Sequence, residues 1–396
     1  MNELDRYVDQ VRTPAYLFSE TAFRVRAEQV REAFGPEVDL CFSIKANPFL
    51  LNALPDTFAK VEVCSPGELA ICKALRIAPE RILFSGVNKT PAEIREAIAY
   101  GAAVLTAESP AHFRMISEAA RELQDGDPNR KVAVLLRLTA GSQFGMDKKD
   151  LKALIAERGE HPWLEITGIH YFSGTQKRKA KENLRELARL TKLIAELEQE
   201  YGFRVRDLEY GAGLDAAYFE KSDAEAEEKE LAALREIAPA VRETGENVHL
   251  TVEMGRFFAA PCGTYVTTVC DQKVCEEVPY AIVDGGAHQV KYDGQLSGML
   301  VPVIGHFSRG GEAQAWTVCG SLCTTADVIC RDAELFGLKT GDRLSFHRTG
   351  AYSVTEGIAL LLSRDLPAVY LVTASGELRL LRDRIETYTL NLPQGL

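Results

Sequence analysis

The sequence predicts an α/β protein built from a (β/α)8 barrel over residues 19–255 and a β-domain formed by residues 1–18 and 256–396. Short β-branched runs alternate with amphipathic helical stretches through the first two-thirds of the chain, a pattern typical of parallel βα units. Eight such runs occur, the number that closes a barrel. After residue 255, alternating apolar and polar residues separated by Gly, Asp and Ser turns indicate an antiparallel sheet.

The eight candidate barrel strands are short runs rich in β-branched residues. Between them lie helical segments such as AEIREAIAYG and NLRELARLTKLIAELEQEYG, with apolar residues at helical spacing and a glycine at the end. A doubly wound open sheet is the competing fold, but its glycine-rich turn after the first strand is missing. The strands are expected at residues 39–44, 60–64, 81–86, 102–107, 131–138, 164–171, 205–211 and 248–255.

The β-domain is expected to contain the runs GTYVTTVC, PYAIVDGG, AWTVCGS, RLSFHRTG and AVYLVTASGELRLL. The early run PAYLF, residues 14–18, precedes the barrel. Its position allows it to return and pair within the β-domain.

Charge and composition exclude several function classes. The 396 residues are 46% hydrophobic and carry a formal net charge of −11, so nucleic acid and anionic membranes are poor partners and a small-molecule or protein substrate is favoured. The first residues are charged and lack an apolar signal core, and no run approaches the ~18 apolar residues of a membrane helix.

Cysteine usage indicates a reduced, cytoplasmic protein. The nine cysteines are scattered without CxxC pairs, so we expect neither a disulfide framework nor a zinc site. Cys319 and Cys323 are four residues apart, but histidines with ligand spacing are missing nearby, and we expect no metal. Cys41, Cys64 and Cys72 are interpreted as small core residues.

Polar residues at the strand ends predict the chemistry, because a barrel builds its site there. Lys45 follows the first strand, and Glu253 and Arg256 end the eighth. Gly211 and Gly213 follow the seventh strand, where exposed backbone N–H groups and the nearby arginine suit a phosphate. A carboxylate such as Glu253 keeps a pyridine nitrogen protonated. Lysine, phosphate cradle and deep carboxylate together fit pyridoxal 5'-phosphate (PLP).

Nine motifs then occur in order along the chain: FSIKAN, VEVCSPGELA, FSGVNKT, GIHYFSGTQ, EYGAGL, EMGRFF, VDGGAHQ, CGSLCTTADVI and GAYSVTEG. With them the chain resembles the fold type III PLP-dependent decarboxylases, the ornithine and diaminopimelate decarboxylase family. That resemblance implies an alanine-racemase-like TIM barrel followed by an antiparallel β-barrel domain. It also implies an amino-acid decarboxylase that works as a homodimer with shared active sites.

The resemblance implies a role for each matching residue. Lys45 matches the lysine that holds PLP as a Schiff base, and Glu253 matches the carboxylate on the pyridine nitrogen. Cys323 matches a cysteine that reaches the neighbouring subunit's site and can return a proton to the substrate carbon. The remaining implied cofactor contacts are Glu62 beside the cofactor, Phe172 at the ring-stacking position, and Thr175, Gly213, Gly255, Arg256 and Tyr352 around the phosphate.

Three departures from the family pattern concern the substrate. Phe172 replaces a histidine, so it can stack but cannot hydrogen-bond. Three residues separate LLRL from SQFGMD where relatives carry a longer loop, which predicts a more open pocket wall. Thr324 stands where diaminopimelate decarboxylases have a glutamate, and their distal arginine is missing. His288, Thr324 and Asp327 are the candidate substrate contacts, although His288 is equally explained as a turn residue bound to backbone.

These departures favour the branch that acts on conjugated or carrier-bound amino acids in secondary metabolism, as in butirosin-type and siderophore-type pathways. Free diaminopimelate, ornithine or lysine is the alternative substrate. An amino-acid racemase is disfavoured because its ring nitrogen normally meets an arginine rather than Glu253, and a non-catalytic regulatory homologue is disfavoured because Lys45 and Arg256 survive. His170 is interpreted as a structural strand residue, and Arg137 as either cofactor support or an ion-pair partner.

Overall fold

The computed structural model describes residues 2–123, 131–307 and 310–393. The chain divides into two compact units. The barrel unit comprises residues 26–215 and 231–255, and the β unit comprises the segments up to residue 25, 216–230 and from 256 onward. Each is described by itself. Within the described residues no helix is both long and apolar enough to cross a membrane.

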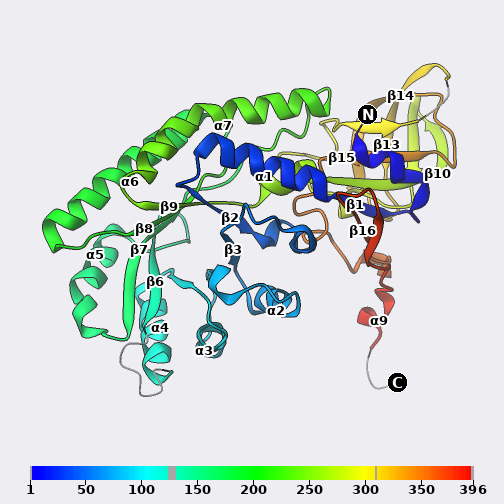
Figure 1. Cartoon of the computed structure of the whole chain (residues 1–396). Helices are drawn as coiled ribbons and strands as arrows, with labels where there is room; N and C mark the ends of the chain where they lie inside the picture. Colours follow the sequence, from blue (N-terminus) through cyan, green and yellow to red (C-terminus); the bar gives the residue numbers. More distant parts are fainter. Residues whose placement is uncertain (1, 124–130, 308–309, 394–396) are drawn as a thin grey trace. The chain divides into compact units, whose positions relative to one another are not determined.

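Eight parallel strands of the described chain close into a barrel, in sequence order around the ring, which confirms the predicted fold class (Figure 1). Their side chains are buried almost throughout because one face points into the barrel and the other meets the helices. The strands are β2 (Asp39–Ser43), β3 (Lys60–Val63), β4 (Ile82–Phe84), β5 (Val104–Ala107), β6 (Val132–Leu138), β7 (Leu164–Phe172), β8 (Asp207–Gly211) and β9 (His249–Met254).

Local signals fix where the barrel helices begin and end. Ser65, Thr90 and Ser109 each cap a helix that starts with proline, and the side chains accept hydrogen bonds from the first turn. Gly101 and Gly202 end helices in the left-handed conformation that glycine tolerates. The helices are α1 (Glu20–Phe34), α2 (Pro66–Ala74), α3 (Pro91–Tyr100), α4 (Pro110–Glu122), α5 (Lys148–Ala156), α6 (Ala180–Tyr201) and α7 (Asp223–Gly245), with the short 3-10 turns η2 (Ile44–Ala46) and η3 (Pro48–Ala53) after β2.

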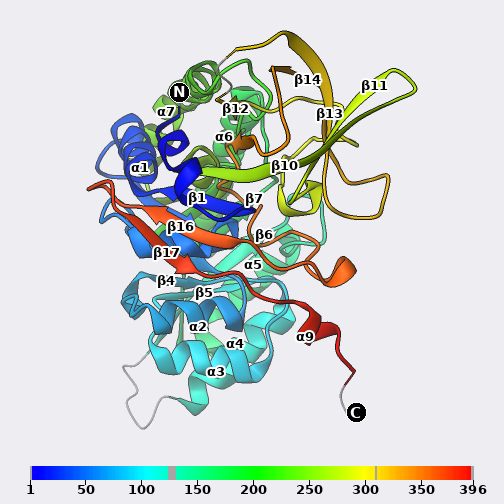
Figure 2. The ribbon, with the colours of Figure 1, turned by 90° about the vertical axis from the view of Figure 1, so that its right-hand side faces the viewer.

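The β unit is a mainly antiparallel sheet in which β1 lies between β10 and β16 (Figure 2). β1 therefore pairs within the β-domain, as its position allowed. Two pairings, β1–β16 and β11–β13, are parallel. The strands are β1 (Ala15–Ser19), β10 (Gly263–Cys275), β11 (Val278–Val283), β12 (Ile304–His306), β13 (Ala313–Cys319), β14 (Val328–Phe336), β15 (Arg343–His347), β16 (Ala368–Val372) and β17 (Leu378–Arg382).

Buried ion pairs explain why residues 216–230 group with the β unit, although the sequence places them in the barrel. Glu230 pairs with Arg348, and both side chains are almost completely buried. Asp223 hydrogen-bonds His347 at 2.8 Å. The unit also contains the short helices η1 (Glu3–Gln10), α8 (Arg256–Ala259), η6 (Ala260–Cys262), η7 (Ala287–Gln289), η8 (Leu361–Ser363) and α9 (Tyr388–Asn391), while η4 (Pro79–Arg81) and η5 (Glu157–Glu160) belong to the barrel.

Candidate active site

Lys45 lies directly after β2, in the short turn η2 at the carboxyl end of the barrel. Its Nζ donates to Oε2 of Glu62 at 2.6 Å and lies 3.7 Å from Oε1 of Glu253. The lysine side chain remains 39% exposed, whereas both carboxylates are buried. The ammonium is thus oriented by two buried acids while staying accessible to an incoming molecule.

A cavity of about 290 Å³ opens above this lysine, entirely within the barrel unit. It brings together four residues that the sequence singled out for the cofactor: Lys45, Glu62, Phe172 and Glu253. Pockets for small ligands typically combine apolar walls with a few polar groups, as here. The other lining residues are Cys64, Gly86, Val87, Arg137, Phe144 and His170.

Glu253 is the buried carboxylate of this cavity. Its Oε1 accepts from Oγ of Ser43 at 2.6 Å, and Oε2 lies 3.3 Å from Nε2 of His170. Burial alone raises the pKa of Glu253, but the Lys45 ammonium and His170 outweigh it and hold the pKa well below its usual range. Oε2 nevertheless has no hydrogen-bond partner within the described chain. An ionised oxygen is therefore available for a further donor.

Glu209, on β8, is a second acid beside Glu253 that the sequence did not single out. It is 1% exposed, and neither carboxylate oxygen has a hydrogen-bond partner among the described residues. Burial, followed by the charges of Glu253 and Glu62, raises the pKa of Glu209 well above its usual range. Burial therefore favours the protonated form of this carboxyl group.

His170, Glu209 and Glu253 could offer one donor atom each to a metal ion, because these atoms lie within 4.8 Å of one another. A metal requires deprotonated ligands. The raised pKa of Glu209 opposes the loss of the proton that metal binding would require.

Phe144 lies in the short loop for which a more open pocket wall was predicted, and its ring lines the cavity. The guanidinium of Arg137 lies 4.9 Å from the Phe144 ring centroid and pairs with Glu108 at 2.5 Å. The other Glu108 oxygen accepts from the backbone N–H of Gly145. The short loop is thus held by Arg137 of β6 and by Glu108, the residue after β5, and it places an aromatic ring in the cavity lining.

Cys64 is a correction to the sequence interpretation. Instead of belonging only to the core, its side chain lines the cavity, with Sγ 3.5 Å from Nζ of Lys45. Burial and then the Glu62 carboxylate raise the pKa of the Cys64 thiol well above its usual range. The thiol is therefore protonated and is a poor nucleophile.

Thr175, Gly211, Gly213 and Gly255 stand at the ends of β7, β8 and β9, as the sequence predicts. A Cβ on Gly211 would collide with the ring of Phe172. Gly213 has φ +61°, and a Cβ there would collide with the carbonyl of Gly174. The turns after β7 and β8 therefore approach too closely for larger residues.

Arg256 and Tyr352 meet in the β unit. The Arg256 guanidinium lies 4.5 Å from the Tyr352 ring centroid and donates to the hydroxyl of Tyr218 at 2.9 Å. Asp293 is 3.9 Å away. The arginine is almost fully buried, so it is held in one orientation.

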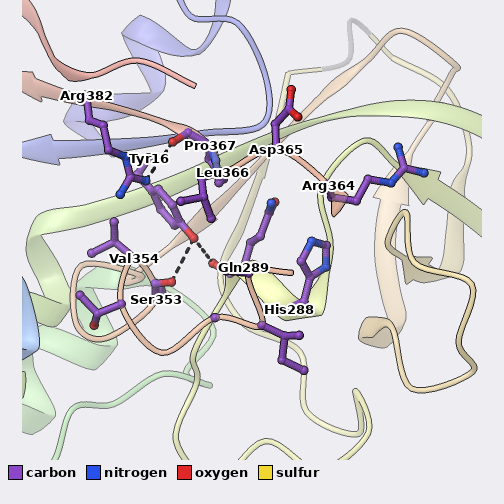
Figure 3. A pocket seen from close by; sticks show the side chains of 14 residues that line it. Tyr16, His288, Gln289, Ser353, Val354, Arg364, Asp365, Leu366, Pro367 and Arg382 are labelled. Atoms are coloured by element: carbon purple, nitrogen blue, oxygen red, sulfur yellow. Dashed lines mark hydrogen bonds between the residues drawn. The ribbon is translucent and has the colours of Figure 1, made fainter. Parts of the chain in front are cut away.

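His288 lines a separate cavity of about 170 Å³ in the β unit (Figure 3). Its side chain is 4% exposed, and neither ring nitrogen has a hydrogen-bond partner in the described chain, which disagrees with a backbone-bound turn histidine. Nδ1 lies 3.7 Å from Oδ2 of Asp327. Tyr16, at the back of this cavity, donates to the carbonyls of Gln289 and Ser353.

The loop that carries Cys323 and Thr324 leaves both residues exposed. Asp327 stabilises this loop, because its two carboxylate oxygens accept hydrogen bonds from the backbone N–H groups of Ala287 and Leu322. These bonds explain why Asp327 is buried. Contacts of His288, Thr324 and Asp327 with a substrate remain predictions.

His170 and Phe144 were the cavity residues least visible from the sequence. His170 is two residues before Phe172 on one strand, so both side chains point to the same side, and this period of two was an available signal. No comparable signal existed for Phe144, because its position depends on how the loop folds back onto Arg137 and Glu108.

Comparisons with known proteins agree with this geometry. Residues 20–260 match the family described as "Pyridoxal-dependent decarboxylase, pyridoxal binding domain". The chain is 25% identical to L-glutamyl-[BtrI acyl-carrier protein] decarboxylase of Niallia circulans, over 96% of this chain and 93% of that protein. It is 26% identical to the diaminopimelate decarboxylase of Aquifex aeolicus, covering 94% and 89% of the two chains.

A solved structure shows the same fold. Diaminopimelate decarboxylase of M. jannaschii, in complex with L-lysine, superimposes with a TM-score of 0.87 and 23% identity, covering 99% of this chain and 94% of that one. The family match spans more than half of the chain. The chain therefore belongs to the pyridoxal-dependent decarboxylases, carboxy-lyases that act on amino acids with pyridoxal phosphate as cofactor.

Proposed function

We propose that Lys45 holds the cofactor and that Glu253 pairs with its ring nitrogen. The buried Glu253 Oε2 without a hydrogen-bond partner supports this assignment, because it offers an ionised acceptor to a protonated pyridine. Phe172 provides an apolar face for the ring. The cavity therefore fits a pyridoxal ring attached through Lys45.

The phosphate group is assigned to the turns after β7, β8 and β9 and to the adjacent arginine. Gly213 lies so close to the Gly174 carbonyl, and Gly255 to Ala46, that a Cβ would collide at either position, and their backbone N–H groups are the donors that we propose for the phosphate. In the β unit, the Tyr352 ring and the Tyr218 hydroxyl fix Arg256. Thr175 is the hydroxyl contact in this assignment.

When bound, the cofactor supplies an electron sink for the pair left by the broken Cα–carboxylate bond. Glu253 keeps the positive charge on the ring nitrogen. Phe144 and Phe172 give the cavity an aromatic lining, which reduces the access of water to the reacting atoms. Cys323, exposed on its loop, is proposed to return a proton to the substrate carbon in the site of a second copy of the chain, as a homodimer.

We further propose that the substrate is an amino acid whose distal end is conjugated or attached to a carrier. Among the described residues that line the barrel cavity, the two cationic side chains are already committed: Arg137 pairs with Glu108, and Lys45 is assigned to the cofactor. A free distal carboxylate, such as that of diaminopimelate, would therefore find no uncommitted cation among these residues. The lack of an uncommitted cation among these lining residues is the observation that supports the substrate proposal. It agrees with similarity to a decarboxylase of a carrier-bound glutamyl group.

Release of carbon dioxide from paired substrates tests this proposal. The L-glutamyl thioester of pantetheine is compared with free glutamate, diaminopimelate, lysine and ornithine. We expect kcat/KM to be at least about 100-fold higher for the thioester, because remote contacts contribute binding energy to the reaction. Decarboxylation of a free diamino acid with kcat/KM of about 10⁴ M⁻¹s⁻¹ or more would contradict it.

A further inference from the structure

Glu186, on the second turn of α6, joins the segments that follow β7 and β8. One carboxylate oxygen accepts from the hydroxyl of Ser173. The other accepts from Nζ of Lys177 and from the hydroxyl of Tyr210, each at 2.7 Å. We call Ser173, Lys177, Glu186 and Tyr210 the Glu186 hub. Its members come from one helix and from two neighbouring strand ends.

Lys177 is an unusual member because its side chain is only 5% exposed. Burial lowers the pKa of Lys177, and the ion pair with Glu186 opposes that shift. A buried ammonium is costly without its carboxylate partner. The two charges cancel, so the Glu186 hub adds no net charge to its surroundings and its effect is geometric.

The backbone of the same segments is tied together as well. Lys177 donates its backbone N–H to the carbonyl of Gly213 at 2.9 Å. From the same helix as Glu186, Asn183 donates to the Tyr210 hydroxyl and to the carbonyl of Ala212. The turn containing Thr175 and the turn containing Gly213 are therefore held against one support, the start of α6.

These two turns have little freedom to move independently. Gly213 adopts φ +61°, and its Cα lies so close to the carbonyl of Gly174 that no Cβ fits between them. An anion bound by backbone N–H groups requires several donors at fixed positions, and small displacements of one turn would lose part of the set.

We propose that the Glu186 hub is the positioning element of the phosphate cradle and that it makes the protein select the phosphorylated form of its cofactor. The inference rests on the proposed phosphate contacts of Thr175 and Gly213. Glu186 and Lys177 act through the turns and do not touch the phosphate. Loss of the hub therefore weakens recognition of the phosphate and leaves recognition of the pyridine ring unchanged.

The test compares two cofactor forms on the full-length protein. The purified holoenzyme is freed of cofactor by hydroxylamine treatment and dialysis, and equilibrium dialysis then gives the dissociation constants of PLP and of pyridoxal. The main variant, Lys177→Met with Glu186→Leu, replaces the ion pair by apolar side chains so that no charge is left buried. Tyr210→Phe removes a single hub hydroxyl. Glu196→Gln, also on α6, is the matched control, since it breaks ion pairs with Lys148 and Lys152 of α5 that are not part of the Glu186 hub.

We expect the double variant to bind PLP at least about tenfold more weakly, the scale of one hydrogen bond to a charged group, while pyridoxal affinity stays within about twofold. Tyr210→Phe should show a smaller change of the same kind, and Glu196→Gln none. If the double variant loses affinity equally for PLP and for pyridoxal, or for neither, the ratio of the two dissociation constants is unchanged. That result would overturn the inference. A wild-type protein with no preference for PLP would instead overturn the proposed phosphate site itself.

Discussion

Nζ of Lys45 lies 2.6 Å from a carboxylate oxygen of Glu62, at the carboxyl ends of β2 and β3. Strand pairing explains this contact, because Ser43 is in register with Glu62 across the two strands. The lysine is thereby directed over the barrel mouth, with Glu253 as the second acid near its ammonium. Near this lysine, burial raises the pKa of Glu209, whereas the Lys45 ammonium and His170 hold the pKa of Glu253 below its usual range.

The first prediction separates the two acids at the base of the cavity. Glu253→Gln should lower kcat about 10²- to 10³-fold, because the ring nitrogen loses the ionised group that stabilises its charge. Glu209→Gln is the matched control and should stay within about tenfold of the wild type, since burial raises the pKa of Glu209 and so favours its neutral form. Steady-state kinetics and the cofactor content per subunit check both. Equal losses in the two variants would contradict the assignment of Glu253.

The second prediction concerns the aromatic wall. Phe144→Ala removes a ring that lines the cavity while retaining the Arg137–Glu108 pair behind it. We expect the KM of the best substrate to rise by a factor of about 10, the scale of one buried aromatic contact, with a smaller effect on kcat. A change confined to kcat would show instead that Phe144 contacts the reacting atoms.

The third prediction tests the shared site. Lys45→Ala and Cys323→Ala should each be nearly inactive as pure proteins. Mixing them under conditions that exchange subunits should restore up to about a quarter of wild-type activity, because half of the dimers then contain one intact site. Size-exclusion chromatography of each variant controls for assembly. If the two variants exchange subunits but the mixture recovers no activity, each chain must complete its own site.

The fourth prediction concerns stability and pH. Burial alone lowers the pKa of His347, but hydrogen bonds to Asp223 and Asp5 raise it from 6.5 to about 9. Because the folded pKa is raised, the stabilisation is complete below about pH 6.5 and is lost as the pH rises through about 9. It amounts to at most about 3 kcal/mol.

Urea unfolding of the wild type and His347→Gln measures this contribution. The unfolding free energy of the wild type should clearly exceed that of the variant at about pH 6, and this difference should shrink towards about pH 10. A difference in unfolding free energy that is independent of pH would mean that His347 acts through packing rather than charge.

Residues whose positions follow from strand register could be predicted from the sequence. Lys45, Glu62 and Glu253 stand at strand ends of a barrel, and parallel strands bring their carboxyl ends together. The cavity that joins them confirms that they meet. The strand β10 was also visible in the sequence as the alternating run GTYVTTVC, although the short helices α8 and η6 separate it from β9.

Other features depend on contacts between distant residues and escaped prediction. The loop with Phe144 folds onto Arg137 and Glu108, and no local pattern encodes that return. β14 was not predicted because Arg331, Asp332 and Glu334 interrupt its apolar run, yet it pairs with β13. Glu209 was missed because the sequence does not show whether an acidic strand residue faces solvent or the interior. Its burial, which marks it as a site residue, is known only from the structure.

The most direct test is the identity of the lysine that binds the cofactor. The protein is incubated with PLP, reduced with borohydride, digested and analysed by mass spectrometry. We predict one pyridoxyl group per chain, located on Lys45 and absent from Lys45→Ala. Lys89 is the informative alternative, because burial lowers its pKa to about 8 and increases its reactivity. A label on Lys89 or Lys177, or no stoichiometric label at all, would contradict the account.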